Sequence, residues 1–589
     1  MPNERLKIFD EDFLVSSQIE RAPHWTMIRE LTMNAIEAAA RATGEKVVHW
    51  TSGKYQGTRK AVLWNTGPGM SPADLRKATD LACQLNKSLG LDENFGVGAK
   101  VSSLANNKEG LRIRSCKDGH VSEVILGYDP TLKSYVRFAR DLPNGAVDTV
   151  IDVTQGAIAE GRKTAVDWTE VMLMGNSLQQ DTVAMPFAGV TTEKALVATS
   201  LYRRFYRLPA GVKVRLDSEY HRLSGTRPFI PVGQRYEKFA RAESVRVAEF
   251  DITLHFLHDP TVTDRSGNRV SSSNALGNST TTCCLIHKNE MYSVMTGSEW
   301  SAAAPRFGIP FGSKELSVHI ELGDNEARPT QYRERLISRQ AGSDILPEDY
   351  SVCVRERMPD WVKEVIRNAS PRRTEDYNDL RKELQDLLNK YRVRVEGRKL
   401  SDGEGDPSVD MAGQHLARQG TTGERSREAT ARRRFHEAPE GATVTSLYEI
   451  YEKAPSIIML ERIEDVVDKG LKGRAAIFVR ETGELFVNGL YEAVERSIAD
   501  TEAELAGEAD PETVRRVLTN AARWAMAYRV GKGTVFALAK RANEDWNDAD
   551  MMAALSKESL SMAADDYLEN LPAVRKRARE DIRLEKIAA

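Results

Sequence analysis

The chain has 589 residues, more than one hydrophobic core usually supports, so about two to four domains are expected. Its 83 Lys and Arg residues nearly balance 86 Asp and Glu residues, and the net charge of -3 gives no global electrostatic case for binding nucleic acid or an anionic membrane. Five cysteines without paired spacing argue against a disulfide framework or a zinc module. No window of the sequence approaches the roughly 18 apolar residues of a membrane span. A cytoplasmic protein is therefore expected.

Helical patterns and short strand-like runs alternate over residues 1–225, with glycines between them. The strand-like runs are EKVVHW, KAVLW, LRIRSC, TVIDV and TEVMLM. This alternation predicts an α/β sandwich for the first part of the chain.

The helical run RELTMNAIEA, residues 29–38, places three polar groups along one stripe. Glu30, Asn34 and Glu37 are spaced four and three residues apart, so they share one helical face. The apolar face is made by Ile28, Leu31, Ala35, Ala38 and Ala39. A solvated helix face is the ordinary explanation of such a stripe, and a ligand site is the alternative that the following motifs favour.

Three later motifs follow that helix in a fixed order. VLWNTGPGMS, residues 62–71, is a strand that runs into a turn with Gly67 and Gly69, where bare backbone can approach a flat ligand and Met70 can lie against it. NFGVGAKVSSL, residues 94–104, has a glycine pair before a helical pattern, so backbone N–H groups and Lys100 could surround phosphate oxygens. DWTEVMLM, residues 167–174, puts Thr169 at the start of a strand.

The order and spacing of these motifs resemble those of the GHKL ATPase superfamily, nearest in motif style to its heat-shock chaperone, MORC and phage rIIA-type branches. ELTMNAIEA resembles the first family motif, NTGPGM the adenine motif, FGVGAK the glycine-rich lid and WTEV the later threonine motif. The resemblance covers residues of about 20–175 and implies a Bergerat-type α/β sandwich that binds ATP and Mg²⁺.

The resemblance also implies roles for single residues. Glu30 would orient and deprotonate the attacking water, Asn34 would bind Mg²⁺ through its amide oxygen, and Glu37 would support the same polar pocket. The adenine end would be formed by Asn65, Gly67, Gly69, Met70 and Thr169, and the lid by Phe95, Gly96, Val97 and Gly98, with Lys100 at the phosphates.

Asn65 departs from the family pattern, in which an aspartate accepts a hydrogen bond from the adenine amino group. An amide keeps an acceptor oxygen, loses the charge and adds a donor. Because that donor could meet the carbonyl oxygen of guanine, we expect poorer discrimination against GTP than an aspartate would give.

Residues 226–340 are rich in strand-like runs, including VAEFDITLHFL and ELSVHIEL, and are predicted to form a second α+β domain. VHIELGDNEARPTQYRERL, at its end, resembles the transducer segment of family members in which a basic residue reaches the γ-phosphate. Arg333 is the predicted residue for this role, and Arg328 and Lys314 remain alternatives.

The rest of the chain is expected to be mostly helical. Residues 341–396 read as a helical connector broken at Pro371, residues 397–443 as a flexible linker, and residues 444–589 as a mostly helical C-terminal domain with a hairpin in AAIFVRETGELFVNGL. VGKGT, residues 530–534, lacks the earlier glycine of a P-loop, because Met526 stands there.

These features together predict an α+β protein that hydrolyses MgATP. Hydrolysis would drive lid closure and the switching of a nucleotide-dependent homodimer that acts on a macromolecular partner, either DNA or another protein. A nucleotide-gated interaction module without significant turnover is the alternative.

Overall fold

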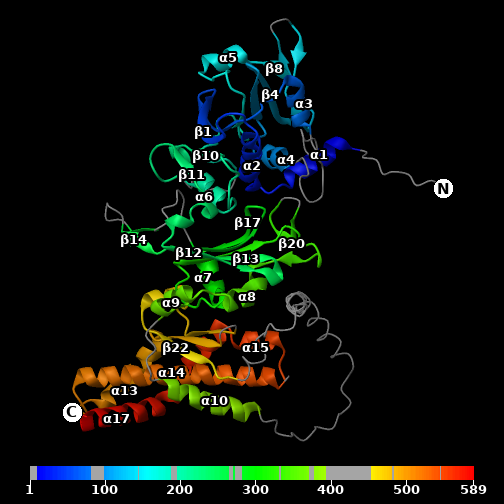
Figure 1. Ribbon diagram of the computed structural model, residues 1–589. Coiled ribbons are helices and arrows are strands. Elements are labelled where there is room, and N and C mark those ends of the chain that lie inside the picture. The colour runs from blue at the N-terminus through cyan, green and yellow to red at the C-terminus, as the bar shows by residue number, and fades with distance from the viewer. Residues whose placement is uncertain are drawn as a thin grey trace, which may run out of the picture. The chain divides into compact units, whose positions relative to one another are not determined.

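The computed structural model describes residues 10–80, 98–142, 145–187, 195–263, 269–271, 281–330, 333–370, 377–392, 453–480, 483–543 and 545–588 (Figure 1). The chain forms two compact units: Met1–Val294 with Ser317–Pro347, and Met295–Leu316 with Glu348–Ala589. The predicted mixed α+β class is confirmed, because both units contain sheets and helices. The predicted domain boundaries at 225, 340, 396 and 443 stay predictions, and the predicted linker 397–443 lies outside the described residues.

The first unit contains a nine-stranded sheet. Along its path the strands are β11 (Arg227–Phe229), β10 (Lys213–Leu216), β1 (Val47–Tyr55), β2 (Thr58–Thr66), β9 (Trp168–Leu173), β3 (Leu111–Lys117), β4 (His120–Asp129) and β5 (Ser134–Arg137), and β8 (Val150–Asp152) pairs with β4. Each of the five strand-like runs predicted in this region overlaps one of these strands, namely β1, β2, β3, β8 and β9.

Helices cover one face of this sheet. The residues of the shared core come from α1 (Glu11–Glu20), α2 (Thr26–Ala40), α3 (Pro72–Thr79), α4 (Gly98–Leu104) and α6 (Leu196–Tyr202), and from inward-facing strand positions. Helix α2 buries Ile28, Leu31, Ala35 and Ala39 against this core, as its apolar stripe predicts. The polar stripe of α2 is therefore turned away from the core. Ala38, which was also expected on the apolar face, is only half-buried and lies beside Gly67.

The opposite face of the sheet is lined by paired charges. Arg114 bonds Glu123 and Glu160, while Arg112 lies 3.7 Å from Glu170, and all but Glu160 are buried. Helix α5 (Thr154–Ala159) adds a small apolar cluster on this side. The strands β6 (Arg140–Asp141) and β7 (Val147–Asp148) form a separate two-stranded ribbon.

A second, five-stranded sheet follows in the order β12 (Arg241–Val247), β13 (Ile252–His258), β18 (Leu316–Leu322), β16 (Thr282–His287) and β17 (Glu290–Thr296). Two small sheets accompany it, β14 (Thr261–Thr263) with β15 (Arg269–Ser271), and β19 (Ala327–Pro329) with β20 (Leu336–Ser338) and β21 (Asp344–Ile345). The start of β17 is joined to the first domain, because Glu290 forms a β-bridge with Phe205.

The second unit begins with short helices and continues into a helical bundle beside a three-stranded sheet. It contains α7 (Gly297–Ala303), α8 (Ser351–Glu356), α9 (Asp360–Ala369), α10 (Asn378–Arg392), α12 (Ile463–Asp468), α13 (Glu492–Leu505), α14 (Pro511–Ala542), α15 (Asp548–Ala554), α16 (Lys557–Asp565) and α17 (Leu571–Ala588). In its sheet, β24 (Glu484–Asn488) lies between β22 (Ser456–Leu460) and β23 (Ala476–Val479). β23 and β24 pair antiparallel, which confirms the predicted hairpin.

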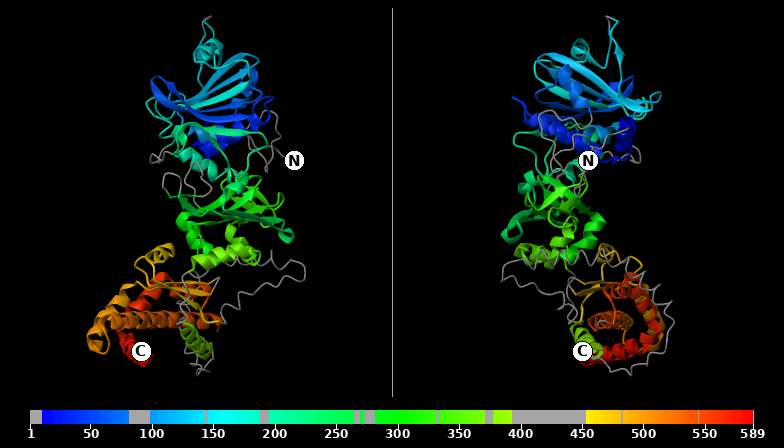
Figure 2. Two further views of the ribbon diagram at one scale, coloured as in Figure 1. Left: turned by 60° about the vertical axis from the view of Figure 1, so that its left-hand side comes forward. Right: turned by 90° about the vertical axis from the view of Figure 1, so that its right-hand side faces the viewer.

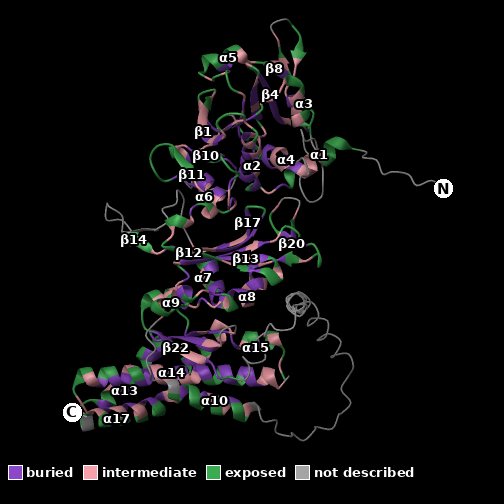
Figure 3. Cartoon of the chain, viewed as in Figure 1, coloured by how far each residue is buried: buried purple, intermediate pink, exposed green. Residues whose placement is uncertain are grey.

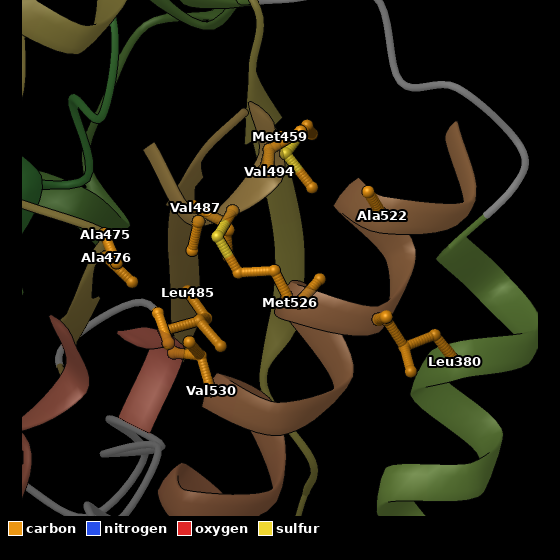
Figure 4. Close-up of a cluster of buried hydrophobic side chains, with 14 of the residues drawn as sticks. Leu380, Met459, Ala475, Ala476, Leu485, Val487, Val494, Ala522, Met526 and Val530 are labelled. Carbon is orange, nitrogen blue, oxygen red and sulfur yellow. The ribbon is translucent and has the colours of Figure 1, made fainter. Parts of the chain in front are cut away.

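Helix α14 is the centre of this unit. The orange and red helices α13, α14 and α17 lie side by side in Figure 2, and α13 and α17 keep an exposed outer side in Figure 3. Met526 on α14 packs toward Val487 of the sheet, and Leu380 of α10 packs against the same helix (Figure 4). The segment VGKGT lies inside α14, where a Cβ added at Gly531 would meet Leu384 at 2.6 Å. This glycine lets α10 approach closely, in agreement with the prediction that VGKGT is not a P-loop.

The part of the chain that the structure describes contains no helix with both the length and the apolar character needed to cross a bilayer.

Candidate functional site

Two polar residues predicted for the adenine end, Asn65 and Thr169, lie in one row with Ser115 across three neighbouring strands. Asn65 of β2 lies opposite Thr169 of β9, and Thr169 lies opposite Ser115 of β3. The hydroxyl oxygens of Thr169 and Ser115 are 2.9 Å apart. Because directly paired residues share a sheet face, this row lies on the helix-covered side, with Leu63, Ile113 and Val171 of the core beside it. Ser115 was not among the predicted residues, although the alternation in LRIRSC places it on this face.

The glycine turn after β2 is held between α2 and β3. A Cβ added at Gly67 would lie 3.1 Å from the carbonyl oxygen of Ala38, and a Cβ at Gly69 would lie 2.1 Å from that of Cys116. Gly69 also has a φ of +60°, which L side chains rarely adopt. The next N–H group, that of Met70, donates to Ser115 Oγ at 2.9 Å. Both glycines are therefore required by the packing of the turn itself.

The Asn65 amide is oriented by a backbone carbonyl. Asn65 is buried, and its Nδ2 donates to the carbonyl oxygen of Thr66 at 2.9 Å. One of the two N–H groups of Nδ2 is thus engaged by backbone, and Oδ1 remains an acceptor for an incoming amino group. The second N–H group of an amide can still donate, so the expected weaker discrimination against GTP stays a prediction.

The carboxylate of Glu30 lies beside the first residue of α4. A Cβ added at Gly98 would stand 2.1 Å from Glu30 Oε2, while Glu30 Oε1 accepts a hydrogen bond from Arg29 Nη1. The side chain of Glu30 keeps 16% of its surface exposed. The structure therefore brings together Glu30 and the predicted lid residue Gly98.

Asn34 and Glu37 continue the stripe of α2. Asn34 is exposed and Glu37 is half-buried. Within the described ranges, no group of three or more His, Cys, Asp and Glu side chains could hold a metal ion. The role of Asn34 as a Mg²⁺ ligand stays a prediction.

Lys100 is directed to a different partner from the predicted one. Its Nζ donates to the carbonyl oxygen of Ala78 at 3.0 Å and to that of Asp80, at the end of α3. In this position the ammonium group satisfies the last carbonyls of a helix. A phosphate contact by Lys100 would require it to leave α3. The lid residues Phe95, Gly96 and Val97 lie outside the described residues.

Behind Glu30 stands a cluster of charged groups that the sequence motifs did not reveal. The Glu290 carboxylate accepts from Arg29 Nε at 3.2 Å and from Arg204 Nε at 2.7 Å, and Arg333 Nη1 lies 3.8 Å from it. Burial alone would raise the pKa of Glu290, but the charges of Arg204 and Arg29 outweigh it and lower that pKa to about 2. Glu290 is therefore a buried, ionised carboxylate.

Of the three candidates for the transducer cation, Arg333 is the one placed in this cluster. Its side chain is 20% exposed and its backbone is left-handed, with a φ of +53°. Arg328 is exposed on β19. Lys314 belongs to the second unit, where its Nζ lies 3.1 Å from Asp468.

Comparisons with known proteins give little support for assigning this chain to a family. No protein-family model matches the sequence, and no curated protein matches it. One solved structure to which the chain is similar is the ATPase region of Saccharomyces cerevisiae topoisomerase II bound to ICRF-187 (dexrazoxane), with 10% identity, a TM-score of 0.32, and coverage of 59% of this chain and 86% of that one. A TM-score this low does not establish a common fold.

Proposed function

We propose that this protein binds MgATP and hydrolyses it, with Glu30 as the general base. Hydrolysis would open and close the lid that begins before Gly98 and would control a nucleotide-dependent homodimer acting on a DNA or protein partner. The motif order that resembles the GHKL superfamily and the geometry around α2 support this proposal.

The observation that carries the proposal is the arrangement along α2. Glu30, Asn34 and Ala38 follow one another at intervals of four residues, so they lie on one stripe of the helix. Gly98 lies against Glu30 at one end of this stripe, and Gly67 lies against Ala38 at the other. Eight residues of helix span about 12 Å. This order supports the proposal, because an extended nucleoside triphosphate would need a turn at its base, a Mg²⁺ ligand at its phosphates and a carboxylate beyond them.

The chemistry of each group suits its place. Oδ1 of Asn65 would accept from the adenine amino group, and the bond from Nδ2 to Thr66 helps to fix the orientation of the amide. The carboxylate of Glu30 is partly exposed, so a water molecule can reach it. Asn34 offers a neutral oxygen to a hard cation without adding charge near the phosphates.

Steady-state ATPase assays and a fluorescent ATP analogue test the proposal on the full chain. Wild type should turn over MgATP, and Glu30→Ala should bind the analogue normally while turnover falls about 10²–10⁴-fold, the usual contribution of a general base. Unchanged turnover in Glu30→Ala would remove Glu30 from its role. Binding without turnover in wild type would favour the nucleotide-gated interaction module, and absence of binding would overturn both functions.

A further inference from the structure

Glu290 holds arginines from three separate parts of the chain. Arg29 comes from α2, Arg204 from the segment after α6, and Arg333 from the segment before β20. The Glu290 side chain is only 4% exposed, and those of Arg29 and Arg204 are 9% and 14% exposed. Buried charges persist only when they are paired, so these groups fix one another's positions.

Arg29 connects this cluster to the predicted base. Its Nε and Nη2 both bond the Glu290 carboxylate, and its Nη1 bonds Glu30 Oε1. A guanidinium is a rigid planar fork, so the two bonds to Glu290 decide where the third N–H group points. The position of Glu290 therefore controls how Arg29 meets Glu30.

Glu290 is itself fixed to the second sheet. It is the first residue of β17, it bridges Phe205, and the N–H group of Met291 donates to the Arg204 carbonyl at 2.8 Å. The guanidinium of Arg204 also lies 4.1 Å from the ring centre of Tyr292. A displacement of β17 would consequently reach the Arg29 guanidinium through one carboxylate.

We propose that Glu290 is a positioning residue that acts on Glu30 through Arg29 and so makes hydrolysis depend on the placement of β17. This inference rests on the proposed ATPase function. With Glu290 ionised, Arg29 uses one edge of its fork on Glu290 and only Nη1 on Glu30, which leaves Oε2 of Glu30 for a water molecule. Without Glu290, Arg29 turns its fork to Glu30 and occupies both oxygens.

A double-mutant cycle tests this dependence. Turnover and ATP-analogue affinity are measured for wild type, Glu290→Gln, Arg29→Gln and the double variant. We expect Glu290→Gln to lower kcat about 10–100-fold with little change in affinity, because a misplaced catalytic group costs about that much. In the Arg29→Gln background the same change should alter kcat less than about threefold, since coupled residues are not additive.

The matched control is Glu123→Gln. Glu123 is equally buried and also lies among three arginines, Arg112, Arg114 and Arg140, but it lies on the opposite face of the large sheet. It should lose stability as Glu290→Gln does while kcat stays at the wild-type value. If Glu290→Gln does not fold, Glu290→Asp keeps the charge and withdraws it by one methylene, and the cycle is run with that variant.

The outcomes separate the two proposals. Turnover in wild type with a non-additive cycle supports the role of Glu290. Turnover in wild type with additive effects, or an equal loss of kcat in Glu123→Gln, overturns that role and leaves the ATPase function standing. Absence of turnover in wild type overturns the ATPase function, and the role of Glu290 falls with it.

Discussion

Replacing Gly98 by alanine should slow catalysis about 10²-fold while leaving the fold intact. The added Cβ would stand 2.1 Å from Glu30 Oε2. Ordinary carbon–oxygen contacts are about 3.3 Å or longer, so the carboxylate must retreat by roughly 1.2 Å. The group that yields is the end of a flexible side chain, and the backbone at Gly98 is helical.

The expected effects on stability and rate differ in size. Alanine at a helical glycine stabilises by about 0.4–1 kcal/mol, and an off-rotamer glutamate costs about 0.5–1.5 kcal/mol, so the free energy of unfolding should change by no more than about 1 kcal/mol. A displacement of about 1 Å in a catalytic group can lower the rate about 10²-fold. Gly98→Ala should therefore keep its melting temperature and its affinity for ATP while kcat falls about 10²-fold.

A coupled ATPase assay, binding of a fluorescent ATP analogue and thermal unfolding measure these three quantities. The matched control is Gly156→Ala, because Gly156 is also helical, lies in the same domain on α5 and has open space where its Cβ would be. It should turn over ATP like wild type. Wild-type kcat in Gly98→Ala would refute the placement of the Glu30 carboxylate against the lid helix during catalysis.

Further predictions concern selectivity, pH and nucleotide state. Because Nδ2 of Asn65 gives only one of its two N–H groups to a backbone carbonyl, the other could donate to guanine, and wild type should discriminate against GTP less than Asn65→Asp does in competition binding. Asn65→Asp should also lose about 1–3 kcal/mol of stability with the bond to Thr66, and equal ATP/GTP affinity ratios in the two proteins would contradict the prediction on selectivity. Burial and the charge of His255 lower the pKa of His319 from 6.5 to about 3. As the pH falls, the unfolded chain therefore takes up this proton at a higher pH than the folded state does. The stability that neutral His319 contributes above pH 6.5 should then be lost as the pH falls toward 3, and His319→Gln should flatten that slope in denaturation series. A non-hydrolysable ATP analogue, unlike ADP, should favour a dimer and protect residues 328–336 from proteolysis, and Arg333→Ala should bind nucleotide yet turn over slowly; a wild-type protein that stays monomeric with the analogue would count against the switch.

Periodicity was sufficient to predict the local parts of the site. The spacing of Glu30 and Asn34 placed both on one face of a helix, and alternating apolar residues predicted the strands that carry Asn65 and Thr169. These features depend on residues close in sequence. Their geometry follows from the repeat of a helix or a strand.

The partners of Arg29 could not be predicted in this way. Glu290 lies 261 positions away in the sequence, and no local pattern predicts which strand lies beside α2. The sequence did offer one indication of a buried ion pair, namely Glu290 directly before Met291 in a strand-like run. An ionised side chain in a buried strand needs a cation beside it. Similarly, Lys100 follows the lid glycines in sequence, but the carbonyl oxygens that end α3 lie within its reach.

The packing of α10 on α14 also bears on the continuity of the polypeptide. Leu380, Leu384 and Leu388 of α10 are fully buried in the same core as Met526 and Val530, so the residues on both sides of 397–443 belong to one folded body. Burying a leucine side chain is worth about 1.5–3 kcal/mol, and three of them far exceed thermal energy. A nick between residues 397 and 443 would then yield two fragments that remain associated without a peptide bond, and the halves made separately could complement each other.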